Sequence, residues 1–133
     1  MVAMTPVFFF AGLLLLLLVV LALALWKSRR RHIAKKDAER LWRQWGEVQR
    51  LPDLHRRVLD AEKVVESALT MLGYRGTFAE KLKVAGPRFS QLEALWAAHK
   101  LRNRIAHEMG IALQEQEVAR TLRAFERALN DLT

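Results

Sequence analysis

The residues best suited to chemistry lie together in residues 99–108, whose sequence is HKLRNRIAHE. This decapeptide combines two histidines, two arginines and one asparagine with apolar residues of good helix propensity. An imidazole can transfer protons near neutral pH, and a guanidinium can bind an anionic oxygen pair through two hydrogen bonds. No other stretch of the chain concentrates so many such groups, so the decapeptide is the candidate site.

The spacing of these residues places them on a helix. His99, Asn103 and His107 are four residues apart, so they line one face of the helix predicted over residues 91–109, with Arg102 on the flank of that face. The apolar residues that continue the face are Leu92, Trp96 and Ala106. We therefore expect a face that is otherwise buried, in which the polar groups either pair with each other or line a cleft or an interface.

Several chemistries do not fit the decapeptide. His99 and His107 are separated by eight residues, about 12 Å along a helix axis, so they cannot bind one metal ion from the same helix. Asn103 between them is a poor zinc ligand. The chain contains no cysteine, and no serine lies at a spacing that suits a nucleophile. We expect neither a metal ion nor a cofactor.

A purely structural role suits the same residues. Asn103 and His107 can bond each other or backbone carbonyls, and Arg102 can pair with an acid of the last helix such as Glu117 or Glu126. This alternative stays open beside a functional one.

The first 26 residues predict a transmembrane anchor. They carry no charged side chain, and residues 7–26 form an apolar run interrupted only by Gly12. As a helix this run is about 30 Å long, which matches the hydrocarbon core of a bilayer. A cleaved signal peptide is the rival interpretation, but the positive segment that precedes the apolar run in such peptides is missing.

Basic residues follow the anchor immediately. The predicted lipid contacts are Lys27, Arg29, Arg30, Arg31, Lys35 and Lys36. Since positive flanks stay in the cytoplasm, we expect an inner (plasma) membrane protein with its N-terminus outside and its C-terminal domain in the cytoplasm. Residues 27–57 hold eleven Lys/Arg and four Asp/Glu, whereas residues 58–133 hold eleven and ten, so the excess charge of the chain lies beside the membrane.

Residues 27–52 predict a basic juxtamembrane helix that ends near Pro52. Its apolar stripe consists of Ala38, Leu41, Trp42, Trp45 and Val48. Two alternatives stay open: an interfacial helix on anionic lipid, or a stalk whose tryptophans pack on the following domain.

Residues 53–133 predict a small antiparallel helical bundle, so the fold class is all-α with no strand. The first long stripe is Leu54, Val58, Ala61, Val65, Ala68 and Leu72, and the last is Val118, Leu122, Phe125, Leu129 and Leu132. Capping boxes at Thr77–Glu80 and Ser90–Glu93 predict the starts of two helices between these stripes. About 80 residues make a marginal core, which favours a homodimer.

The motif Arg102-Asn103-x-x-x-His107 resembles the signature of HEPN domains, small helical bundles found in many bacterial and archaeal ribonucleases. The chain also looks like small membrane-anchored proteins of uncharacterised function from bacteria with reduced genomes. The HEPN resemblance implies metal-independent RNA cleavage at a dimer interface, with the ribose 2′-OH as nucleophile. It implies His107 as general acid/base, Arg102 as phosphate ligand and Asn103 as an orienting residue, with His99 on the same face.

Two functions follow as hypotheses. The first is a single-pass membrane protein whose cytoplasmic bundle self-associates and acts as an interaction or scaffold module. The alternative is a membrane-tethered, metal-independent HEPN-type endoribonuclease or RNA-binding domain. The nearly neutral charge of the bundle favours the first, because RNA binding normally needs a basic surface.

Overall fold

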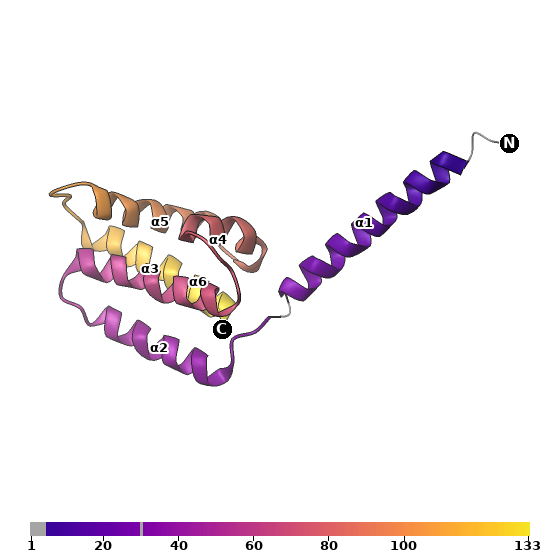
Figure 1. Ribbon diagram of the computed structural model, residues 1–133. Helices are drawn as coiled ribbons and strands as arrows, with labels where there is room; N and C mark the ends of the chain where they lie inside the picture. Colours follow the sequence, from indigo (N-terminus) through magenta and orange to yellow (C-terminus); the bar gives the residue numbers. More distant parts are fainter. Residues whose placement is uncertain (1–4, 30) are drawn as a thin grey trace. The chain divides into compact units, whose positions relative to one another are not determined.

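The computed structural model describes residues 5–29 and 31–133, and this part of the chain contains helices and no strand (Figure 1). The predicted all-α class is therefore confirmed. The helices are α1 (Thr5–Arg29), α2 (Lys35–Gln49), α3 (Leu54–Met71), α4 (Phe78–Ala85), α5 (Leu92–His107) and α6 (Glu115–Leu132), and a short 3-10 helix covers Gly86–Arg88. The chain divides into two units, residues 1–31 and residues 32–133.

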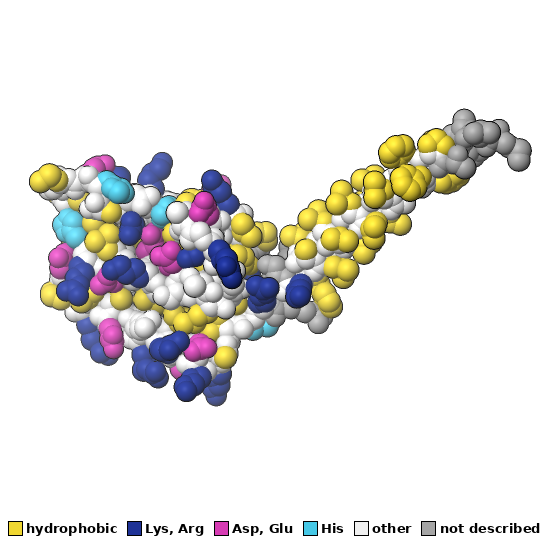
Figure 2. Space-filling view, in the orientation of Figure 1, with side chains coloured by type: hydrophobic (Ala, Val, Ile, Leu, Met, Phe, Trp, Pro, Cys, Tyr) yellow, Lys and Arg dark blue, Asp and Glu magenta, His cyan; other side chains and the backbone are white. Residues whose placement is uncertain are grey.

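Helix α1 belongs to the first unit. Its stretch Pro6–Lys27 is 22 residues long and apolar enough to cross a membrane, a property that anchors share with signal sequences. None of this stretch is buried by protein, and hydrophobic side chains coat the helix in Figure 2. An uncovered apolar surface of this length is unstable in water, because each buried Å² of apolar surface contributes about 25 cal/mol.

The core of the second unit lies between α3, α5 and α6, which pack against one another. Both predicted stripes face this core. The largest side chains with almost no exposure are Phe125, Leu129 and Val118 from α6, Val58, Val65 and Leu69 from α3, Leu95 from α5, Leu41 from α2 and Leu82 from α4. Leu54 and Leu122, at the margins of the stripes, are only partly buried. Four-and-three spacing therefore located the core faces of α3 and α6 correctly.

Helix α2 packs on α3 and is part of the same compact unit. Leu41, Trp45 and Val48 of its apolar stripe are buried in the core. The indole Nε1 of Trp42 donates a hydrogen bond to Oγ1 of Thr133 at 3.1 Å, which ties α2 to the C-terminal residue. The apolar stripe of α2 is thus covered by protein, as in the second of the two alternatives for this segment.

The helix starts differ in how they are capped. The predicted capping box of α4 forms, with Glu80 N donating to the Thr77 hydroxyl and Thr77 N donating to the Glu80 carboxylate. The predicted box at Ser90 is wrong. The amide and hydroxyl of Ser90 both bond Oδ2 of Asp131 at 2.8 Å, so this residue ties the start of α5 to the end of α6 instead.

Candidate functional site

Helix α5 turns its apolar side, and not its polar side, toward the core. Leu95, Ala98 and Leu101 are the buried residues of this helix. Asn103 is only partly buried and His107 is exposed. The expectation that the face of these two residues is buried is therefore wrong, because α5 packs on the bundle along a different stripe, centred about 140° away around the helix axis.

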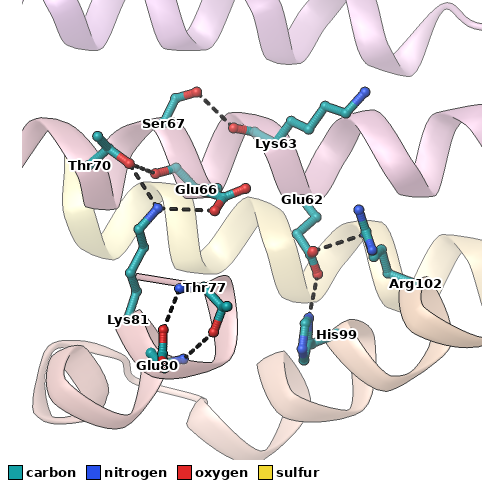
Figure 3. A network of polar contacts seen from close by, with 10 residues as sticks. All are labelled: Glu62, Lys63, Glu66, Ser67, Thr70, Thr77, Glu80, Lys81, His99 and Arg102. Atoms are coloured by element: carbon teal, nitrogen blue, oxygen red, sulfur yellow. Dashed lines mark hydrogen bonds and ion pairs between the residues drawn. The ribbon is translucent and has the colours of Figure 1, made fainter. Parts of the chain in front are cut away.

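His99 is the exception, because it lies at the margin of the buried face and reaches α3. Its Nδ1 lies 2.7 Å from Oε2 of Glu62 (Figure 3). Only 13% of the His99 side chain and 4% of the Glu62 side chain is exposed. The imidazole also packs against the ring of Phe78, with 5.1 Å between the ring centroids. An ionised carboxylate only accepts hydrogen bonds, so in this pair Nδ1 of His99 carries the proton.

Arg102 binds the other oxygen of the same carboxylate. Its Nε lies 3.0 Å from Oε1 of Glu62, and 28% of the arginine side chain is exposed. The N–H at Nε is not aligned on an acceptor, so the contact is an ion pair rather than a directed hydrogen bond. The pairing predicted for Arg102 with Glu117 or Glu126 is wrong, because Arg104 is the arginine that approaches Glu117, at 3.9 Å.

Asn103 forms hydrogen bonds with both residues that contact Glu62, namely His99 and Arg102. Its Nδ2 donates to Nε2 of His99 at 3.1 Å, and its Oδ1 accepts from the Arg102 guanidinium at 3.4 Å. The alternative bond from Asn103 to His107 is not formed. Four side chains on two helices therefore make one continuous polar cluster, which we call the Glu62 cluster: Glu62, His99, Arg102 and Asn103.

The electrostatics of the Glu62 cluster are set by burial. Desolvation raises the pKa of the Glu62 carboxyl above its usual 4.5, because the charged form loses water. The hydrogen bond and charge of His99 and the charge of Arg102 oppose this change in pKa, and the nearby charge of Glu66 adds to it.

A second polar connection joins α3 to α4. The buried Nζ of Lys81 lies 3.0 Å from both Oε1 of Glu66 and Oγ1 of Thr70 (Figure 3). Only 7% of the Lys81 side chain is exposed. Helix α3 thus holds α4 through Glu66 and α5 through Glu62, on successive turns.

An open groove of about 640 Å³ runs along the outward side of α5. It brings together three of the four predicted site residues, His99, Asn103 and His107. Arg102 does not line it. The remaining residues of the groove are Trp96, Ala97, Lys100, Arg104 and Glu108. Among the described residues, neither His107 nor Lys100 has a hydrogen-bond or ion-pair partner for its side chain, whereas Arg104 lies 3.7 Å from Glu108.

The predicted lipid contacts fall partly outside the described residues. Arg30 is not described, and nothing is described of the Arg29 side chain. Lys27 and Arg31 belong to the first unit and are exposed, and Lys35 and Lys36 are exposed at the start of α2. Glu39 and Glu47 are also exposed on α2, so charges of both signs alternate along this helix.

Sequence reasoning placed Trp96 on the face of the site but missed Glu62. The signal for Glu62 was present, since this acid lies four residues after Val58 and three before Val65, within the apolar stripe of α3. A charged residue at such a position needs a buried partner.

No family model matches the chain, and no curated protein or solved structure is significantly similar to it.

Proposed function

We propose that the chain is a single-pass membrane protein of the inner (plasma) membrane, with α1 as anchor and an antiparallel, HEPN-like bundle in the cytoplasm. The uncovered apolar surface of α1 and the basic residues that follow it support this topology. The exposed side chains among those residues, Lys27, Arg31, Lys35 and Lys36, contact anionic lipid headgroups.

The absence of native cysteine makes this topology directly testable. Single cysteines at Gln116, which is exposed on α6, and at Ala3 report the two sides of the membrane. In intact cells a membrane-impermeant maleimide labels Ala3→Cys only, and both sites react after lysis. Labelling of Gln116→Cys in intact cells would place the bundle outside and refute the proposal.

The bundle itself acts as an interaction module that forms a homodimer through the outward side of α5. One observation favours this role over RNA cleavage: Glu62 binds Arg102 within the bundle, so the arginine and the histidine of the ribonuclease signature do not meet in one groove. The half-buried indole of Trp96 and the exposed Ala97 are the apolar contacts that the groove provides for a partner. An aromatic residue in such a position is typical of interface centres.

The oligomeric state of the full chain in detergent micelles tests this function. Light scattering is expected to give the mass of a dimer for the wild-type protein and of a monomer for Ala97→Glu, because a carboxylate would be desolvated in the interface. The matched control is Gln44→Glu on the exposed side of α2, which should remain dimeric. A monomeric wild-type protein, or a dimeric Ala97→Glu variant, would contradict the proposal.

A second candidate is metal-independent RNA cleavage or RNA binding in the same groove. Its support is the set of groups along the groove, where Lys100 and Arg104 can approach phosphates and Trp96 can stack on a base. The test is cleavage of a single-stranded RNA by the full chain in EDTA, with 2′,3′-cyclic phosphate ends as the expected product. Intact RNA after incubation with the wild-type protein would exclude cleavage.

A further inference from the structure

The two histidines of the groove differ in the side-chain partners of their imidazole rings. His107 is exposed, and no side-chain partner is described for it. Nδ1 of His99 lies 2.7 Å from the carboxylate of Glu62, whose side chain is 4% exposed. A carboxylate on one ring nitrogen sets the tautomer and orientation of an imidazole and leaves the lone pair on the other nitrogen.

The second ring nitrogen of His99, Nε2, is hydrogen-bonded to a residue of the groove. His99 lines the groove, and Nε2 accepts its single hydrogen bond from the amide of Asn103, which also lines the groove. Displacement of that amide by a ligand exposes a lone pair that is already oriented. A base held by a third group in this way is the arrangement that activates hydroxyl groups in many unrelated enzymes.

We propose that His99 is the proton acceptor of the groove and that Glu62 is its positioning residue. This inference rests on the second candidate function, the cleavage of RNA. It differs from what the HEPN resemblance implies, because the base becomes His99 instead of His107. Helical spacing puts these two residues about 12 Å apart along α5, so they cannot exchange roles at one phosphate.

Cleavage of the RNA phosphodiester by His99 requires water as the only additional reactant. Nε2 of His99 takes the proton of the ribose 2′-OH, O2′ forms a bond to phosphorus, and the bond from phosphorus to O5′ breaks. The departing O5′ takes a proton from water, and the hydroxide so formed removes the proton from the His99 imidazolium. The phosphate charge is met by Lys100, which lines the groove, because Arg102 is occupied by Glu62 and Arg104 lies near Glu108 and Glu117.

The test compares cleavage by matched variants of the full chain in detergent micelles with EDTA. His99→Gln is expected to lower kcat by about 100-fold or more, the usual contribution of a general base. His107→Gln should lower it less than about tenfold, since that residue would not transfer the proton. Glu62→Gln should lower kcat at unchanged KM, and should add nothing in a His99→Gln background, because a positioning residue acts only through its histidine.

The possible results distinguish a failure of the RNA-cleavage hypothesis from a failure of the role assigned to His99. Intact RNA with the wild-type protein overturns both the second candidate function and this inference. Cleavage that survives His99→Gln, or that is lost equally in His107→Gln, overturns the inference alone. If His99→Gln fails to fold, diethyl pyrocarbonate modification of the wild-type protein decides: inactivation must follow acylation of His99 by mass spectrometry, and inactivation that follows His107 refutes the assignment.

Discussion

Removal of the Glu62 carboxylate is the sharpest perturbation of the bundle. In Glu62→Leu the guanidinium of Arg102 loses its ion-pair partner and the Nδ1–H of His99 loses its hydrogen-bond acceptor. Breaking a buried ion pair from one side typically costs 3–5 kcal/mol. The Arg102 side chain keeps 28% exposure, so water can partly replace the lost partner, and we discount the loss of stability to about 2–3 kcal/mol. For a domain of this size that loss lowers Tm by about 10–20 °C.

A double-mutant cycle with Arg102→Met measures the interaction energy between Glu62 and Arg102 apart from the effect of each substitution alone. If the two residues interact as described, the doubly substituted chain should be about 1–2 kcal/mol more stable than the sum of the single losses predicts. The assay is urea unfolding of the full chain in detergent micelles, followed by tryptophan fluorescence from Trp42, Trp45 and Trp96. Strict additivity, or a loss below about 0.5 kcal/mol for Glu62→Leu, would refute a coupled cluster.

Three further predictions concern the same bundle. Burial raises the pKa of Glu62 in the folded state, so the folded chain binds the carboxyl proton more tightly than the unfolded chain does, and the stability that this difference adds is complete below the usual value of 4.5 and is lost as pH rises through the raised pKa. Urea titrations should therefore show the wild-type protein losing stability with pH in this window relative to Glu62→Gln, although the ionised carboxylate still contacts Arg102 and His99 above it. Thr77→Ala removes the acceptor of the Glu80 amide and should cost about 0.5–2 kcal/mol by the same assay, and equal stability would contradict the observed cap. Phe125→Ala leaves a cavity at a side chain with 0% exposure and should cost about 3–5 kcal/mol, whereas a loss below 1 kcal/mol would show that the core collapses around it.

The elements of the bundle follow largely from local physical chemistry. The stripes of α3 and α6 are visible because core residues recur with the helical period, and the Thr77–Glu80 box is visible because its hydrogen bonds span only three residues. The same local rule failed at Ser90, where a residue from α6 offered a better acceptor. Asp131 is distant in sequence, and no local pattern indicates that it would reach the start of α5.

The site was harder to predict than the helices. Spacing correctly grouped His99, Asn103 and His107 on one groove, because three positions on a helix have a fixed geometry. It did not show which side of α5 meets the core, because the helix carries apolar residues on more than one side. The partner of Arg102 was also missed, since Glu62 comes from a helix 40 residues earlier in the sequence, and such a contact depends on packing.

The central claim is that the outward side of α5 is where the bundle meets a second copy of itself. Cross-linking in native membranes tests it directly, using a short bis-maleimide and single cysteines at Ala97 on the groove and at Gln44 on the exposed side of α2. The account predicts a covalent dimer for Ala97→Cys and a monomer for Gln44→Cys at the same level of expression. Equal cross-linking at both positions, or a dimer only at Gln44→Cys, would contradict it.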